Sequence, residues 1–206
     1  MQQLTFFLAA TVRMAAPLLI AALGLIVSER AGLMNIGVEG TMLSGAFAAF
    51  AISYYTQSYV LGLLAGMLAG GIMALLFAVA AIRFRAPQIV IGCAINLLGS
   101  GLTAVLFRKI FVEVVGGVAQ VPSFPDATLP LLSKIPFIGE ILFSHNVLIY
   151  FAFLMVPVMW FVMNRTPIGI QIIAVGEQPK VADSLGINAF TTRYAATLFS
   201  GFMMGI

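Results

Sequence analysis

The stretch SERAGLMNIGVEGTMLSGAF, residues 28–47, begins where one long apolar run ends and finishes inside the next. Its charged and amide residues are Glu29, Arg30, Asn35 and Glu39, and its glycines are at positions 32, 37 and 40. Glycine weakens a helix, and a charged side chain in apolar surroundings is costly unless it is paired. The stretch therefore predicts a broken or re-entrant segment near residues 28–41.

The composition of the chain indicates that lipid is its solvent. Its 206 residues are 62% hydrophobic and only 8% charged, whereas a soluble domain carries about 25% charged residues. Backbone groups in hydrocarbon must be hydrogen-bonded internally, which leaves helices or a closed barrel. The apolar runs do not alternate, and they have the length of helical spans, about 20 residues, rather than of barrel strands. We therefore expect an all-α, polytopic transmembrane helix bundle.

The hydropathy pattern places the predicted spans at residues 4–27, 33–55, 59–82, 88–107 and 146–163. A sixth apolar run opens at Arg193 and reaches Ile206, the last residue of the sequence. That run is too short to cross a bilayer, which takes about 20 residues. We therefore expect residues 1–206 to form a single, partial transmembrane domain that is truncated at its C-terminal end.

The basic residues orient the predicted bundle. Arg83 and Arg85 lie in one short connection, and Arg165 and Lys180 lie in the segment 164–192. Two spans separate these connections, so they share a side, and the positive-inside rule makes that side cytoplasmic. The segment 108–145 then forms an external loop. Its prolines exclude one long helix, and residues 136–143 are either a short amphipathic turn on the membrane surface or an ordinary connector.

The position of Glu39 has two interpretations. A second span that started at residue 41 would be too short, so we predict a start near Leu33, which draws Asn35 and Glu39 into the membrane on one helical face. An ionisable residue in a span costs at least about 2.5 kcal/mol and is a functional candidate, and broken helices at membrane depth line substrate cavities. Alternatively, Glu39 lies in the first helical turn at the interface, where the helix dipole favours a carboxylate.

Two further patterns concern contacts between spans. In QIVIGCAINLLGSGLT, residues 88–103, Asn96 shares a stripe with a glycine one turn before it and a serine one turn after it. Asn96 either bonds across helices or faces a polar substrate. In GLLAGMLAG, Gly62, Gly66 and Gly70 recur every four residues and predict a bare stripe on which another helix packs closely.

The segment 164–192 contains a predicted short helix. Pro179 suits the first position of a helix, and Gly186 suits its end. Between them, Val181 and Leu185 share a face. A helix this short is unstable alone in water, so it needs a partner surface. The alternative is a plain connector.

Several functions are excluded by missing motifs. The sequence contains no G-x-x-x-x-G-K-[ST] phosphate loop and no H-E-x-x-H zinc motif, and it has one histidine and one cysteine. Its net charge of +3 is small and scattered, which argues against a nucleic-acid partner. We therefore expect neither an enzyme nor a metal or cofactor site.

The stretches that carry these features resemble one protein family. Residues 28–50 resemble the early signature of permease subunits in ATP-binding-cassette (ABC) importers, in the family of branched-chain amino acid and simple-sugar permeases. Residues 166–188, TPIGIQIIAVGEQPKVADSLGIN, resemble the cytoplasmic loop by which these permeases dock on their ATPase. Residues 88–103 and 135–143 are similar to the nucleoside-type members, the shorter permease of the pair.

The resemblance implies a multi-pass permease in a plasma membrane of bacterial type, passing a nucleoside or simple sugar inward. It implies three protein partners besides the lipid bilayer: a second permease, an ATPase that binds the ATP, and an extracytoplasmic solute-binding protein. The implied path residues are Asn35, Glu39 and Asn96. The implied docking residues are Gly176, Glu177, Pro179, Lys180, Asp183, Leu185 and Gly186. The alternative is a stand-alone secondary transporter or channel, which would show two broken spans in matching positions.

Overall fold

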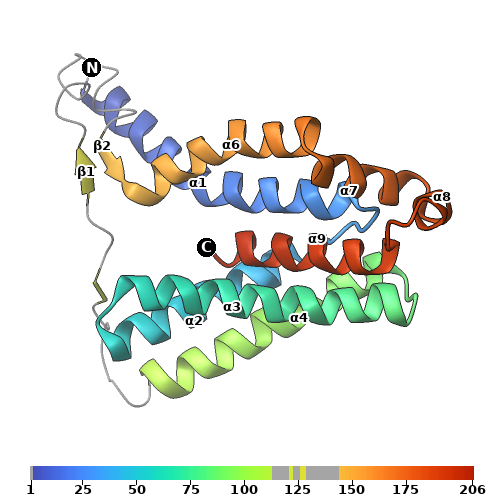
Figure 1. Cartoon of the computed structure of the whole chain (residues 1–206). Coiled ribbons are helices and arrows are strands. Elements are labelled where there is room, and N and C mark those ends of the chain that lie inside the picture. Colours follow the sequence, from blue (N-terminus) through green and yellow to red (C-terminus); the bar gives the residue numbers. More distant parts are fainter. Residues whose placement is uncertain (1, 113–120, 123–125, 129–143) are drawn as a thin grey trace.

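The computed structural model describes residues 2–112, 121–122, 126–128 and 144–206 (Figure 1). The predicted all-α bundle is confirmed, with a small two-stranded sheet as an addition. The elements are α1 (Gln2–Arg30), α2 (Val38–Thr56), α3 (Tyr59–Ala78), the π-helical turn η1 (Val79–Arg83), α4 (Gln88–Phe107), the π-helical turn η2 (Arg108–Val112), β1 (Asp126–Thr128), β2 (Ser144–Asn146), α6 (Val147–Arg165), α7 (Pro167–Glu177), α8 (Pro179–Ser184) and α9 (Ala189–Met204).

The order of the helices in space differs from their order in sequence. α9, the last helix, lies in the middle of the bundle, between α1 and α3 (Figure 1). α6 packs on the outer side of α1, while α2 packs against α3 and α4. The final helix therefore joins helices that precede residue 113 to helices that follow residue 143.

Within the described residues, four helices are long and apolar enough to cross a membrane: Leu4–Arg30, Tyr59–Arg83, Gln88–Val112 and Val147–Arg165. These correspond to four of the predicted spans. The predicted second span is not among them, and its helix, α2, begins at Val38 and not near Leu33. Residues 33–37 therefore do not lengthen it.

The two ends of the bundle carry different connections. The link between α3 and α4, the short helix α8 and the start of α9 lie at one end, and the small sheet lies at the other (Figure 1). β1 and β2 pair antiparallel with Ala127 opposite His145. Which end is cytoplasmic stays a prediction from the basic residues. Residues 136–143, the predicted amphipathic turn, lie outside the described residues, and so does most of the predicted external loop.

Three predicted boundaries are wrong. The segment 164–192 is not mainly a loop, because it contains the 11-residue helix α7. α9 begins at Ala189, four residues before the predicted start. Caps explain both: the Thr166 side chain accepts a hydrogen bond at the start of α7, and the Asn188 side chain does so at the start of α9. In addition, η2 carries the fourth span to Val112, five residues into the predicted external loop.

The glycine stripe of α3 is buried against two helices. A Cβ added at Gly62 would lie 2.8 Å from the carbonyl oxygen of Ala49 in α2. One added at Gly66 would lie 2.5 Å from the carbonyl oxygen of Gly205, at the end of α9, and one added at Gly70 would lie 2.9 Å from the Cα of Gly205. α2, α3 and α9 thus approach at backbone distance, which is how helices associate where lipid provides no hydrophobic drive.

Candidate functional site

The first part of the site is the end of α1. Gly32 has φ +84°, a left-handed conformation that glycine adopts without strain. Its amide donates to the carbonyl of Glu29 at 2.9 Å, and the amide of Leu33 donates to the carbonyl of Ser28 at 3.0 Å. This pair of bonds is a Schellman motif, which ends a helix. α1 therefore stops at a defined turn, and the chain continues as a non-helical segment, residues 31–37, which we call the helix break.

Asn35 organises the other end of the helix break. Its Oδ1 accepts a hydrogen bond from the amide of Gly37 at 2.9 Å, one residue before α2 begins. The side chain is 1% exposed, and its Nδ2 has no hydrogen-bond partner among the described residues. A buried amide of this kind fixes a turn and restarts the helix.

Two side chains of α4 hold the helix break in place. Gln88 Oε1 accepts from the amide of Met34 at 2.8 Å. Two turns later, Asn96 Oδ1 accepts from the amide of Gly40 at 2.8 Å, and its Nδ2 donates to the carbonyl of Ile36 at 3.2 Å. Asn96 makes both of these hydrogen bonds to backbone atoms, so it links α4 to the helix break and to the start of α2.

Gly92 makes this contact between α4 and the helix break possible. It lies between Gln88 and Asn96 on the same face of α4, and a Cβ there would lie 2.9 Å from the Cβ of Ile36. The helix break therefore packs directly against the face of α4 that is formed by Gln88, Gly92 and Asn96.

The three predicted path residues lie in different environments. Asn35 is buried in the helix break, Asn96 is half-buried, and Glu39 is exposed in the first turn of α2. Asn35 and Glu39 do not share a helical face, because Asn35 precedes the helix; that prediction is wrong. Glu39 lies in the first turn, as the alternative interpretation required.

The second part of the site is α8, and the predicted short helix is present. Pro179 is its first residue. After its end, Gly186 has φ +83°, its amide donates to the carbonyl of Asp183 at 3.0 Å, and the amide of Ile187 donates to the carbonyl of Ala182 at 3.0 Å. The Schellman motif that ends α1 thus recurs at the end of α8.

α8 has one buried face and one exposed face. Ala182 is 2% exposed and packs with Val175 of α7 and Ala189 of α9. On the other side, Val181 is 50% exposed and Leu185 is 74% exposed. We call these two side chains the docking face. The chain itself stabilises the inner side of the short helix and leaves two apolar side chains without cover among the described residues.

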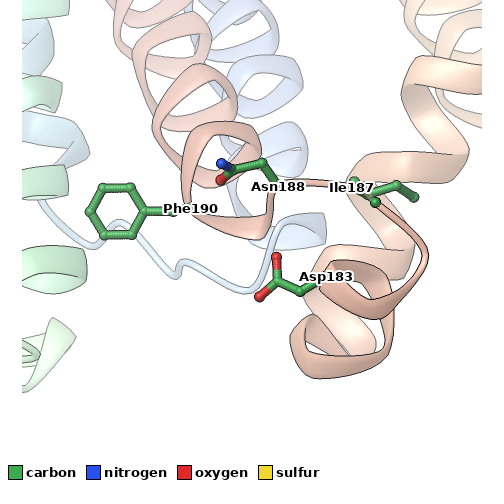
Figure 2. Close-up of a pocket in the computed structure, with 5 residues that line it drawn as sticks. Asp183, Ile187, Asn188 and Phe190 are labelled. Carbon is green, nitrogen blue, oxygen red and sulfur yellow. The ribbon is translucent and has the colours of Figure 1, made fainter.

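A shallow cavity of about 390 Å³ lies where α8 meets α9 (Figure 2). Asp183 and Asn188 approach it from opposite sides, while the ring of Phe190 points away from α8. Asp183 Oδ1 accepts a hydrogen bond from the amide of Ala189 at 2.8 Å. The carboxylate therefore ties the last turn of α8 to the first residue of α9.

The sequence interpretation missed two residues of the site and placed a third differently. Gln88 was not singled out, although it extends the Asn96 stripe by two turns. In the sequence, Arg193 only marks the start of the sixth apolar run, yet its Nε donates to the carbonyl of Ala31 at 3.1 Å. Gly176, a predicted docking residue, packs inward: a Cβ there would lie 3.1 Å from the amide nitrogen of Gly32. Among the described residues, no cluster of histidine, cysteine or carboxylate side chains could hold a metal ion.

Comparison with known proteins identifies the family. The family model described as "Branched-chain amino acid transport system / permease component" matches residues 7–206. The chain belongs to this family. With its apolar helices, this permease chain is a multi-pass protein of the plasma membrane. The resemblance found in residues 28–50 and 166–188 is thereby confirmed.

Three curated relatives match nearly the whole permease chain. It is 39% identical over 95% of its length to a Haloferax volcanii protein whose name includes "glucose ABC transporter permease protein TsgC13". It is 38% identical over 100% of its length to the guanosine ABC transporter permease NupQ of Bacillus subtilis, and 33% identical over 92% to the nucleoside ABC transporter permease NupC of Lactococcus lactis. The matches span 59%, 66% and 62% of these relatives. No solved structure matches the chain significantly.

Proposed function

We propose that the chain forms part of the permease of an ABC importer, in which a partner ATPase drives a small polar solute inward. The observation that carries this proposal is the docking face of α8. It lies at the end of the bundle that carries Arg83 and Arg85, the predicted cytoplasmic end. These two exposed apolar side chains are suited to contact a soluble subunit, because the predicted cytoplasmic end of the bundle lies outside the membrane.

The docking face can contribute apolar surface to a contact with a partner subunit. Burying a leucine or valine side chain fully contributes about 1.5–3 kcal/mol. With Leu185 at 74% exposed and Val181 at 50% exposed, covering both would contribute about 2–3 kcal/mol. Lys180 adds an exposed positive charge beside them. Association of two proteins costs about 4–15 kcal/mol, so the docking face supplies one part of a larger interface.

The coupling proceeds from the ATPase to the spans. ATP binding closes the ATPase dimer, and α8 moves with it. Because α8 is packed on α7 and α9 through Ala182, the motion reaches the bundle and opens the path outward. The solute-binding protein then delivers its ligand at the predicted external side of the bundle, and hydrolysis restores the inward-open state. A second permease subunit completes the path.

The path itself is proposed to pass the start of α2. Glu39 is the exposed member of the three candidate residues, so Glu39 contacts the solute or gates its passage. Asn35 and Asn96 then hold the segment from which Glu39 projects. Few charged residues in the spans favour a neutral, hydroxyl-rich solute. The names of the relatives, for glucose, guanosine and nucleosides, support a sugar or nucleoside as cargo.

Co-purification tests the proposed function. The full-length permease, expressed with an ABC ATPase from the same genome, should retain that ATPase on a tag. Replacing residues 179–186 with a glycine–serine linker of equal length should abolish the association. A matched control replaces Gln57 and Ser58, at the other end of the bundle, and should leave it intact. Retention of the ATPase by the linker variant would show that α8 is not the docking element.

Uptake measurements test the role of Glu39. The Glu39→Gln variant keeps the size of the side chain and removes its charge. It should assemble with the ATPase normally but change the uptake rate of the cargo several-fold. Normal uptake by this variant in the full-length protein would remove Glu39 from the path.

A further inference from the structure

Two hydrogen bonds made by α9 connect α8 with the helix break. The first is the bond from the amide of Ala189, the first residue of α9, to Asp183 Oδ1 at 2.8 Å. The Asn188 side chain reinforces this turn by accepting from the amide of Thr191 at 2.9 Å. The start of α9 is therefore attached to α8 and is itself capped.

The second bond lies one helical turn further along α9. Arg193 Nε donates to the carbonyl of Ala31 at 3.1 Å, and Ala31, the first residue of the helix break, is fully buried. Carbonyls at the C-terminal end of a helix lack intrahelical partners and carry partial negative charge. A guanidinium, which is always protonated and rigidly planar, suits such an acceptor.

Close packing at Gly32 strengthens the same connection. A Cβ on Gly32 would lie 3.1 Å from Arg193 Nη2 and 3.4 Å from the Cα of Gly176 in α7. The turn that ends α1 is thus in contact with both α7 and the Arg193 side chain, although Gly32 itself is exposed. A displacement of α7, α8 and the start of α9 together would carry this turn with it.

The far end of the helix break is attached to a different helix. Gln88 and Asn96 of α4 hold residues 34–40 by hydrogen bonds to backbone. α9 and α4 are separate elements, so the helix break spans two anchors that can move relative to each other. Its backbone is bonded largely to side chains, and each such bond contributes only about 0.5–1.5 kcal/mol. It is therefore the element best able to rearrange when one anchor shifts.

We propose that Arg193 is a positioning residue that transmits the movement of α8 to the helix break, and so couples the ATPase to the start of α2. This inference rests on the proposed function. Asp183 joins α8 to α9, and Arg193 joins α9 to Ala31. Gln88 and Asn96 hold the other end of the helix break on α4. Contact between two sites produces coupling only when an element with two arrangements responds to both sites. In this proposal the helix break is that element, and the two sites are α8 and the start of α2.

The test compares solute uptake with ATP hydrolysis in the reconstituted, full-length importer. Arg193→Gln should retain the ATPase and hydrolyse ATP, but uptake per ATP hydrolysed should fall by at least about fivefold, the lower end of usual coupling between sites. Arg193→Lys, which keeps a charged donor, should lie between this variant and the wild type. Arg165→Gln, an exposed arginine at the end of α6, is the matched control and should keep the wild-type ratio.

The outcomes separate this inference from the proposed function. If the wild-type protein binds no ATPase and takes up no cargo with ATP, the proposed function fails. If the wild type is active and Arg193→Gln keeps the wild-type uptake per ATP, only the role of Arg193 fails. Should Arg193→Gln not accumulate in the membrane, Arg193→Lys decides: a lowered ratio supports the role, and a wild-type ratio overturns it.

Discussion

Substituting two glycines by alanine should have opposite effects on stability. Gly70 of α3 is buried, and an alanine Cβ there would meet the carbonyl oxygen of Gly201 and lie 3.0 Å from the amide nitrogen of Gly205. Gly101 of α4 is exposed, and a Cβ there would have nothing within 4 Å. Both glycines are helical, so both substitutions gain the same helix propensity, about 0.5–1 kcal/mol. The difference between the two variants therefore isolates the steric cost.

That steric cost follows from the geometry at Gly70. The neighbouring atoms are backbone atoms of α9, which cannot rotate away, so α3 and α9 must separate. Overpacking of this kind costs about 1–3 kcal/mol. Gly101→Ala should stabilise the protein by up to about 1 kcal/mol, and Gly70→Ala should be less stable than Gly101→Ala by about 1–3 kcal/mol. Reversible unfolding in lipid bicelles, measured by steric trapping, gives both values. Equal shifts for the two variants would refute the close contact between α3 and α9.

Two further predictions concern the site. Asn96→Ala leaves the buried amide of Gly40 without its acceptor, so it should destabilise the protein by about 1–3 kcal/mol. It should also speed hydrogen exchange at the start of α2, measured by mass spectrometry. Ser100→Ala, one turn later and bonded within its own helix, should have neither effect. The pair Val181→Ser and Leu185→Ser should weaken ATPase binding, measured by titration in nanodiscs, by about 2–3 kcal/mol, with unchanged thermal stability. Phe84→Ser, which removes an equally exposed side chain (74%) outside α8, should leave binding unchanged.

Features that depend on near neighbours in sequence were predictable. Pro179, which starts α8, and Gly186, which follows its end, are seven residues apart and act through local backbone geometry. The glycine stripe of α3 follows from helical spacing alone. The boundaries of α7 and α9 could also have been found, because Thr166 followed by Pro167, and Asn188, are recognisable cap signals. They were missed because the segment 164–192 was treated as one loop.

The existence of the helix break was predicted from the glycines and polar residues of the stretch 28–41, and the structure confirms it at residues 31–37. Its exact course could not be derived from local patterns. Asn35 and Glu39 are four residues apart and would share a face if the helix ran through both. Whether it does depends on partners far along the chain: Asn96 bonds to Ile36, 60 residues away, and Arg193 bonds to Ala31, 162 residues away. A single sequence shows the side chains but not which distant helix supplies them. The contacts that Gln88 and Arg193 make with the helix break therefore became visible only in the folded chain.

The most direct test of the account is transport by purified components in sealed vesicles. The account holds that this bundle has no energy source of its own and is driven through α8 by a partner. Vesicles that contain the full-length permease pair, the ATPase and the solute-binding protein should accumulate labelled cargo when ATP is supplied, and the permease pair alone should not do so under any ion gradient. Gradient-driven accumulation by the permeases alone, insensitive to nucleotide, would contradict the account.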